Sequence, residues 1–145
     1  MSRGLVTTII PVFNRPRQLV EAVESVLAQD YRPIEVLIVD DGSSDETGVV
    51  ADRLAAEHSE ICVVHQPNGG PGRAREAARL QARGEFIQYL DSDDLLLPGK
   101  FSAQVAGLRA SPECGVSYGW TRYRRPDGSL DLARWKPTGH EARSL

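Results

Sequence analysis

The stretch GEFIQYLDSDDLLLP, from Gly84 to Pro98, decides the fold that we predict for this chain. Its first part, FIQYL at 86–90, has the aromatic and aliphatic residues of a buried strand. Three carboxylates then follow within four residues, at Asp91, Asp93 and Asp94. Carboxylates this close repel one another unless a cation lies among them, and oxygen ligands favour a hard divalent ion such as Mg or Mn. The alternative is an Asp-rich turn that caps the next helix.

Apolar runs and helical patterns alternate along the rest of the chain. We expect strands over residues 5–12, 34–39, 61–64, 86–90 and 115–120, with a helix after each of the first four. The helices are expected to begin at Asn14 with Pro16 in the first turn, at the Ser43–Glu46 capping box, at Arg73 and at Pro98. This order predicts an α/β fold, a mostly parallel sheet with helices on both faces.

A short segment with polar or loop-forming residues follows each of the first four predicted strands. These segments are Phe13–Asn14, Asp40–Asp41, the glycine loop at 68–72 and Asp91–Asp94. Because the carboxyl ends of parallel strands share the edge of the sheet where ligands bind, we expect these residues to form one site. A carboxylate at Asp41 suits the imide N–H of uracil or a ribose hydroxyl, and Phe13 offers a ring for stacking on a base. Arg75 could meet a base edge or a phosphate.

Composition narrows the class of protein. The 145 residues are enough for one domain, and the net charge of −3 gives no electrostatic case for nucleic acid. Neither the histidines nor the cysteines have metal-ligand spacing, and Cys62 is expected to be a small buried residue. The P-loop and dinucleotide fingerprints are absent. No apolar run approaches the roughly 18 residues that span a bilayer, and no secretory signal precedes the first strand, so we expect a cytoplasmic protein.

Four motifs lie at the predicted strand ends. They are PVFN at 11–14, VDDGSSD at 39–45, NGGPGRAR at 68–75 and LDSDD at 90–94. In order and spacing they resemble the N-terminal half of a family 2 glycosyltransferase, over roughly residues 4–125. The resemblance implies a GT-A fold, a nucleotide-sugar donor (most often a UDP-sugar), a divalent metal and inversion at the anomeric carbon.

The resemblance also implies roles for residues near the base. The base pocket would be formed by the first motif, Pro11, Val12, Phe13 and Asn14. Asp41 would bind uracil with Asp40 beside it, and Arg75 would lie near the base. Glu76 departs from the family pattern, which usually has asparagine there, so a carboxylate replaces an amide near this helix start.

The acidic motif would serve the rest of the donor. Asp91 and Ser92 would lie near the ribose and diphosphate. Asp93, the last acid of the D-x-D, would be the main metal ligand, with Asp91 as a second one. Asp94 would support the loop or cap the following helix.

The predicted division of the chain is a nucleotide-sugar-binding core at 1–125 and the start of an acceptor part, or a loose tail, at 126–145. The chain ends 52 residues after Asp93 (145 − 93), and the family's catalytic carboxylate comes later. We therefore expect the donor-binding half of the enzyme, truncated or naturally short, without its general base and with little or no transfer activity.

The partners follow from the same resemblance. The acceptor would be a sugar, a lipid-linked precursor or a polysaccharide, which makes the inner face of the membrane an alternative location. An unpaired sheet edge could support a homodimer. Three alternatives remain open: a non-catalytic nucleotide-binding domain, a receiver domain, and a phosphatase of the haloacid dehalogenase type.

Overall fold

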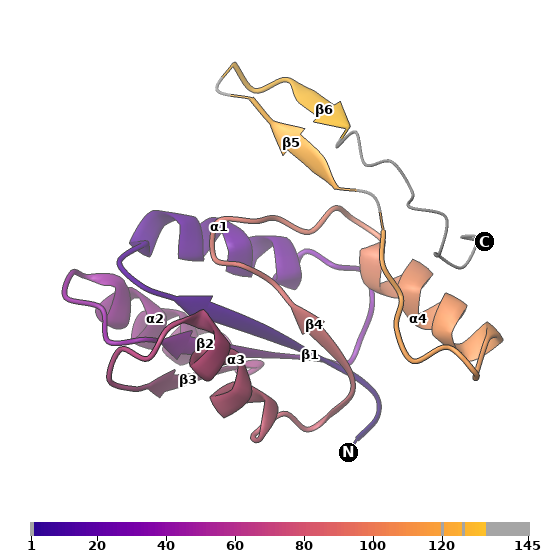
Figure 1. The fold of residues 1–145 in the computed structure, drawn as a ribbon, viewed down its shortest axis with the longest axis horizontal. Coiled ribbons are helices and arrows are strands. Elements are labelled where there is room, and N and C mark those ends of the chain that lie inside the picture. The colour runs from indigo at the N-terminus through magenta and orange to yellow at the C-terminus, as the bar shows by residue number, and fades with distance from the viewer. Residues whose placement is uncertain (1, 120, 126, 133–145) are drawn as a thin grey trace.

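A computed structural model describes residues 2–119, 121–125 and 127–132 of the chain. Figure 1 shows a parallel sheet flanked by helices, with a β-hairpin near the C-terminus. The elements in chain order are β1 (Ser2–Val12), α1 (Pro16–Leu27), β2 (Ile34–Asp40), α2 (Thr47–Glu57), β3 (Ile61–His65), α3 (Pro71–Arg79), β4 (Gly84–Tyr89), α4 (Lys100–Ala110), β5 (Arg122–Arg124) and β6 (Leu130–Leu132).

The sheet has the strand order β3-β2-β1-β4, and every neighbouring pair is parallel. β1 lies in the middle, with Ile9 opposite Leu37 of β2 and Tyr89 of β4. The predicted α/β fold is therefore confirmed for the first four strands. The carboxyl ends of these strands lie at one edge, so the polar residues that follow them come together as expected.

Alternation along the central strands assigns the two faces of the sheet. Ile10 and Ile38 belong to a core that α1, α2 and α4 complete, whereas Ile9 and Leu37 belong to a second core with α3. Successive side chains of a strand point to opposite faces, which explains this division. The α3 side is thin because α3 contributes only the small residues Ala74 and Ala78 to it, along with partly buried Ala82 beyond its end.

The predicted fifth strand is wrong. Residues 115–119 form no strand, and Val116 and Tyr118 are 77% and 62% exposed, while Trp120 lies outside the described residues. A strand needs a neighbour to take its backbone hydrogen bonds, and this apolar segment has none among the described residues. The short antiparallel pair β5–β6 forms further along the chain instead.

Several local expectations also need correction. Cys62 is exposed because β3 is an edge strand of the sheet, so the prediction of a buried cysteine is wrong. α3 begins at Pro71 instead of Arg73, and α4 begins at Lys100 instead of Pro98. The division at residue 125 stays a prediction, and most of the proposed tail, 133–145, lies outside the described residues. None of the helices in the described part of the chain is both long and apolar enough to cross a membrane.

Candidate functional site

The end of β1 forms the floor of a pocket at the carboxyl edge of the sheet. Pro11 and Val12 are buried there, whereas the next residue, Phe13, is 45% exposed. Its backbone follows directly from the rigid central strand. The Phe13 ring is therefore attached to a rigid backbone and is partly exposed, which suits stacking on a flat ligand group.

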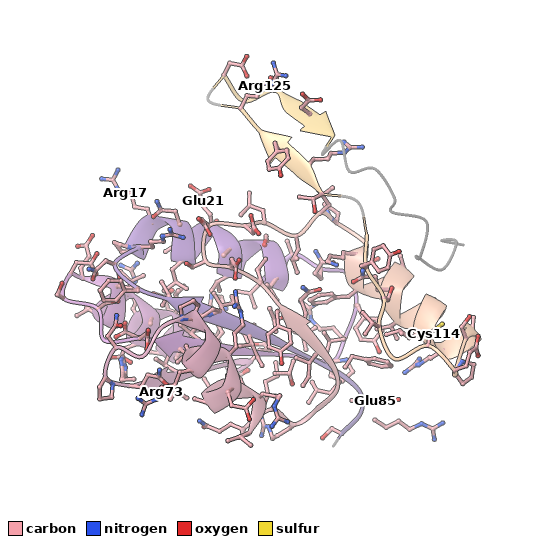
Figure 2. The ribbon with its side chains drawn as sticks, viewed as in Figure 1. Arg17, Glu21, Arg73, Glu85, Cys114 and Arg125 are labelled. Atoms are coloured by element: carbon pink, nitrogen blue, oxygen red, sulfur yellow. The ribbon has the colours of Figure 1, made fainter. Side chains whose placement is uncertain are left out.

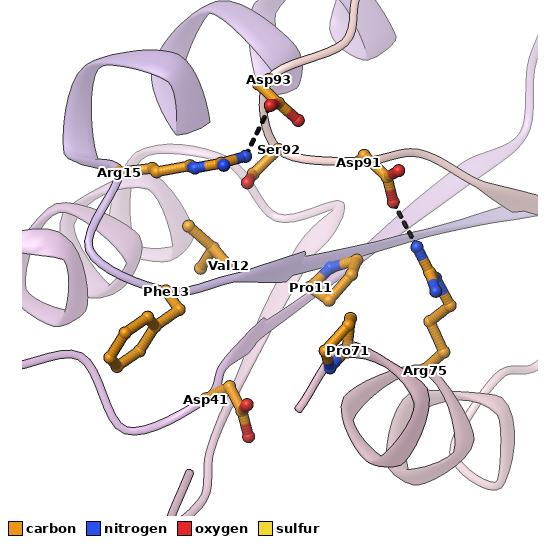
Figure 3. Close-up of a pocket in the computed structure, with 10 residues that line it drawn as sticks. All are labelled: Pro11, Val12, Phe13, Arg15, Asp41, Pro71, Arg75, Asp91, Ser92 and Asp93. Atoms are coloured by element: carbon orange, nitrogen blue, oxygen red, sulfur yellow. Dashed lines mark hydrogen bonds and ion pairs between the residues drawn. The ribbon is translucent and has the colours of Figure 1, made fainter. Parts of the chain in front are cut away.

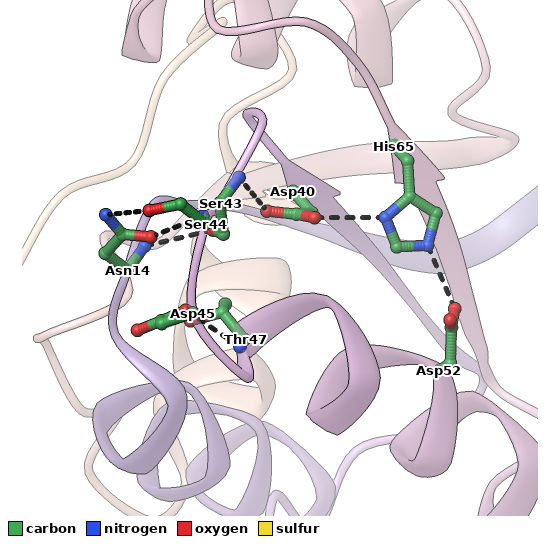
Figure 4. A network of polar contacts seen from close by, with 8 residues as sticks. All are labelled: Asn14, Asp40, Ser43, Ser44, Asp45, Thr47, Asp52 and His65. Atoms are coloured by element: carbon green, nitrogen blue, oxygen red, sulfur yellow. Dashed lines mark hydrogen bonds and ion pairs between the residues drawn. The ribbon is translucent and has the colours of Figure 1, made fainter.

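The turn between β1 and α1 is joined to the loop after β2. Asn14 has a left-handed φ of 52°, its N–H donates to Ser43 Oγ at 3.0 Å, and its Oδ1 accepts from Ser44 N at 2.8 Å (Figure 4). Among the described residues, neither α1 nor α2 has a side-chain hydrogen bond at its N-cap. The predicted caps are therefore wrong, because these polar side chains bind across the two loops instead.

Asp40 points away from the pocket, toward α2 and β3. Its Oδ1 accepts from Ser43 N at 3.0 Å and its Oδ2 lies 3.0 Å from His65 Nδ1, while His65 Nε2 lies 3.0 Å from Asp52 Oδ1 (Figure 4). Burial raises the pKa of Asp40, but hydrogen bonds from Ser43 and His65 outweigh it and hold that pKa below its ordinary value. Hydrogen bonds to Asp52 and Asp40 raise the pKa of His65. Asp40 thus fixes the end of β2.

Asp41 points the other way and holds the glycine loop. Its Oδ1 accepts from Gln66 Nε2 at 2.6 Å and Gly69 N at 2.9 Å, and its Oδ2 accepts from Gly70 N at 2.7 Å. Burial raises the pKa of Asp41, but these three hydrogen bonds and the nearby Arg73 charge hold it below its ordinary value. A carboxylate has about four acceptor positions, so about one on Oδ2 is left for a ligand.

The acidic segment after β4 forms the opposite wall of the pocket. Figure 3 shows Asp93 turned toward Arg15 and Asp91 turned toward Arg75, with Ser92 between them. Arg15 Nη1 lies 2.6 Å from Asp93 Oδ2, and Arg75 forms an ion pair with Asp91. Each of the two carboxylates is therefore paired with a cation from a different element of the fold.

Asp94 adds a third acid to the segment after β4, although it does not line the pocket. Its backbone N–H donates to the carbonyl of Asp91 at 2.9 Å, which closes a turn. Burial raises the pKa of Asp94, and the negative charges of Asp91 and Asp93 raise it further. The segment carries three carboxylates against two guanidinium groups, so negative charge is in excess beside the pocket.

The pocket has a volume of about 420 Å³. It is lined by Pro11, Val12, Phe13, Arg15, Asp41, Pro71, Arg75, Asp91, Ser92 and Asp93 (Figure 3). The structure thus brings together eight of the ten predicted site residues. Asn14 and Asp40 do not line it, because the first binds the loop after β2 and the second binds His65. The binding roles of all ten stay predictions.

Sequence reasoning missed two lining residues, Arg15 and Pro71. Pro71 begins α3 at the end of the glycine loop, so it belongs to a motif that was recognised. Arg15 follows the first motif directly. The sequence does contain a signal for Arg15, because a cation at the start of a helix interacts unfavourably with the helix dipole. Such a residue is expected to have a partner outside the helix.

A divalent ion fits the chemistry of the acidic wall. The oxygens of Asp91, Ser92 and Asp93 are the hard donors that Mg and Mn prefer. In the described part of the chain, however, no three His, Cys, Asp or Glu side chains converge closely enough to hold a metal. Both predicted metal ligands are paired with arginines, each through one carboxylate oxygen, so an ion that takes either of these oxygens would have to displace an arginine.

Comparison with known proteins assigns the family. The model of Glycosyl transferase family 2 matches residues 7–144. The chain belongs to glycosyltransferase family 2. It is 39% identical over 127 residues to glycosyltransferase GlyG of Streptococcus pneumoniae. The aligned region covers 87% of this chain and 42% of GlyG. This chain therefore spans less than half the length of that relative.

Solved glycosyltransferase structures have the same fold. S. aureus TarS 1-349 in complex with UDP-GlcNAc has a TM-score of 0.66 and 30% identity, covering 72% of this chain and 31% of that one. Mannosyltransferase PcManGT from Pyrobaculum calidifontis, in complex with GDP-Man and Mn2+, has a TM-score of 0.66 and 28% identity, covering 71% and 32%. These matches confirm the GT-A prediction and favour it over the receiver and phosphatase alternatives.

Proposed function

We propose that this chain is the donor-binding part of an inverting glycosyltransferase, which binds a nucleoside-diphosphate sugar with Mn or Mg for transfer to an acceptor hydroxyl. The observation that carries the proposal is the division of the pocket. One part has the ring of Phe13 and the carboxylate of Asp41, and the other has the guanidinium groups and acids around Ser92. These two parts match two parts of a nucleotide sugar, its flat base and its charged diphosphate.

The free acceptor position on Asp41 supports uracil as the base. Uracil presents one imide N–H, which matches about one remaining position on a carboxylate that already accepts three hydrogen bonds. Guanine presents two adjacent N–H donors and would compete with Gly70 for Oδ2. Adenine and cytosine present an acceptor at the equivalent ring nitrogen, which a carboxylate repels. We therefore propose a UDP-sugar.

The diphosphate would lie along the acidic wall. A divalent ion held by Asp91 and Asp93, with Ser92 beside them, would stabilise the negative charge that develops on the leaving diphosphate. Arg75, 35% exposed in the pocket, would donate to a phosphate or to the base edge. Deprotonation of the acceptor needs a general base. No carboxylate of the described residues is assigned that role, and we propose that it is supplied by sequence beyond the donor part.

The acceptor is proposed to be a sugar, a lipid-linked precursor or a polysaccharide. We propose that the chain acts in the cytoplasm or at its boundary, the inner face of the membrane. This part of the proposal draws on the family alone.

Calorimetry tests the donor. The chain is titrated with UDP, GDP, ADP and CDP, each with and without Mn, using wild type, Phe13→Ala, Asp93→Ala and the control Val49→Ala. Val49 is 73% exposed on α2 and does not line the pocket. We expect UDP to bind best and only with Mn, and loss of stacking in Phe13→Ala to weaken it roughly tenfold, from about 1–3 kcal/mol per stacked base.

The variants separate the parts of the proposal. Asp93→Ala should lose the Mn-dependent binding of UDP, and Val49→Ala should bind as wild type does. A chain that binds no nucleoside diphosphate under either condition contradicts the donor proposal. Preferred binding of GDP, ADP or CDP contradicts the assignment of uracil and leaves the diphosphate part standing.

A further inference from the structure

Arg15 occupies a place that helix stability does not explain. It is the N-cap residue of α1, where the helix dipole is positive, and Arg17 adds a second cation in the first turn, which contains no acid. The Arg15 side chain makes no cap hydrogen bond to the helix. It lines the pocket instead, with 46% of its surface exposed.

The ion pair between Arg15 and Asp93 is suited to exchange. Both side chains are about half exposed, at 46% and 50%, and ion pairs in such positions contribute little to stability because solvent screens them. Arg75 and Asp91 pair in the same way at the other end of the wall, at 35% and 52%. Each arginine occupies one oxygen of its acid, so an ion that takes that oxygen must displace the arginine.

The backbone of Arg15, in contrast, is fixed. Its N–H donates to Thr47 Oγ1 at 2.9 Å, and Thr47 is fully buried at the start of α2. The same hydroxyl donates to Asp45 Oδ1 at 2.5 Å. The guanidinium group can therefore change partner by rotation of the side chain alone, with no movement of the loop.

We propose that Arg15 is a donor-binding residue, which pairs with Asp93 in the free protein and turns to the donor's diphosphate when a divalent ion takes Asp93. This inference rests on the proposed function and extends it to a residue outside the four motifs. It makes the binding of ion and diphosphate mutually dependent. The ion alone must displace a guanidinium group, whereas the diphosphate offers that group a new partner.

Two binding measurements test the exchange without any activity assay. Binding of Mn alone is followed by the EPR signal of free Mn, and binding of UDP at saturating Mn is measured by calorimetry. Uridine, which has the base but no phosphate, is titrated by NMR. The variants are Arg15→Gln, Arg15→Lys and the control Arg17→Gln. Arg17 lies on the outward side of α1 and does not line the pocket (Figure 2).

Arg15→Gln is expected to move the two affinities in opposite directions. Mn alone should bind a few-fold tighter, because Asp93 is released from a surface ion pair. UDP at saturating Mn should bind about tenfold weaker, from the loss of one hydrogen bond between charged groups. Uridine binding should not change, Arg15→Lys should be intermediate, and Arg17→Gln should match wild type.

The outcomes distinguish the inference from the function on which it rests. If wild type binds UDP with Mn but Arg15→Gln leaves both affinities within about twofold, the inference alone is overturned. Equal weakening of UDP and uridine would assign Arg15 a merely structural role and would also overturn it. If wild type binds no nucleoside diphosphate with Mn, the proposed function fails and takes this inference with it.

Discussion

Replacing Asp41 with asparagine is expected to loosen the joint between β2 and the glycine loop. The carboxylate is 4% exposed and accepts from Gln66, Gly69 and Gly70 at 2.6, 2.9 and 2.7 Å. Asparagine has the same shape but only one acceptor oxygen. If that oxygen takes the place of Oδ1, the amide group of the new side chain faces the N–H of Gly70, so one donor is left without an acceptor.

The expected loss follows from these three bonds. A hydrogen bond to a charged group contributes about 1.5–3 kcal/mol and a neutral one about 0.5–1.5, so the two retained bonds weaken by about 1 kcal/mol each and the third is lost. The neutral amide is cheaper to bury than the carboxylate, which offsets part of this loss. We expect Asp41→Asn to lower the free energy of unfolding by about 2–3 kcal/mol at neutral pH.

Urea unfolding followed by circular dichroism measures the loss, with Glu57→Gln as a control for the change from acid to amide. Glu57 is exposed at the end of α2, so its replacement should cost less than about 0.5 kcal/mol. The difference should also depend on pH. The native pKa of Asp41 lies below the ordinary value of 3.8, so its contribution is present above that value and disappears as pH falls through the native pKa.

The difference between wild type and Asp41→Asn should therefore shrink as the solution is acidified. A loss below about 0.5 kcal/mol at neutral pH would refute the assignment of the loop's anchor to this carboxylate. A difference that stays constant or grows with acid would refute the charge-based part of the reasoning.

Four further substitutions test other parts of the fold. His65→Gln should lower the free energy of unfolding by about 1 kcal/mol at pH 6 and by less at higher pH. The native pKa of His65 is raised, so the stabilisation by its charge is complete below the ordinary pKa of 6.5 and is lost as pH rises through the native pKa. A cost in urea unfolding that does not change with pH would contradict this. Gly84→Ala should destabilise the fold strongly, since the new Cβ would lie 2.6 Å from Thr7 Oγ1. Gly107→Ala should stabilise it by up to about 1 kcal/mol, because a Cβ at this position on α4 would lie in open space. Equal shifts in the melting temperature of the two variants would contradict this packing. Leu19→Ala, on the buried face of α1, should lower the free energy of unfolding by about 2–5 kcal/mol. A smaller loss would mean that the core closes around the cavity.

The central part of the fold was predictable because its signal is local and strong. β1 and β2 are buried on both faces, as strands covered by helices must be, and the mainly apolar sequence runs at 5–12 and 34–39 indicate this directly. The parallel arrangement then places Asp41, Asp91 and Asp93 at one edge. The pocket could be predicted from strand order for the same reason.

What sequence reasoning missed depends on contacts between distant segments. Val116 and Tyr118 have the composition of a strand, but composition does not supply a neighbouring strand. Asn14 and Ser43 are good capping residues by type, yet each found a partner in the other's loop. Arg15 belongs to no motif, and only the placement of Asp93 opposite it reveals its partner.

The adjacent acids at the end of β2 set a limit on how this domain can change in length. Asp40 reaches His65 on one side of the sheet and Asp41 reaches the glycine loop on the other, because consecutive residues of a strand face opposite ways. One residue inserted into or deleted from β2 would exchange these directions and aim each carboxylate at the wrong loop. Transplants and chimaeras of this domain should therefore leave the length of β2 unchanged.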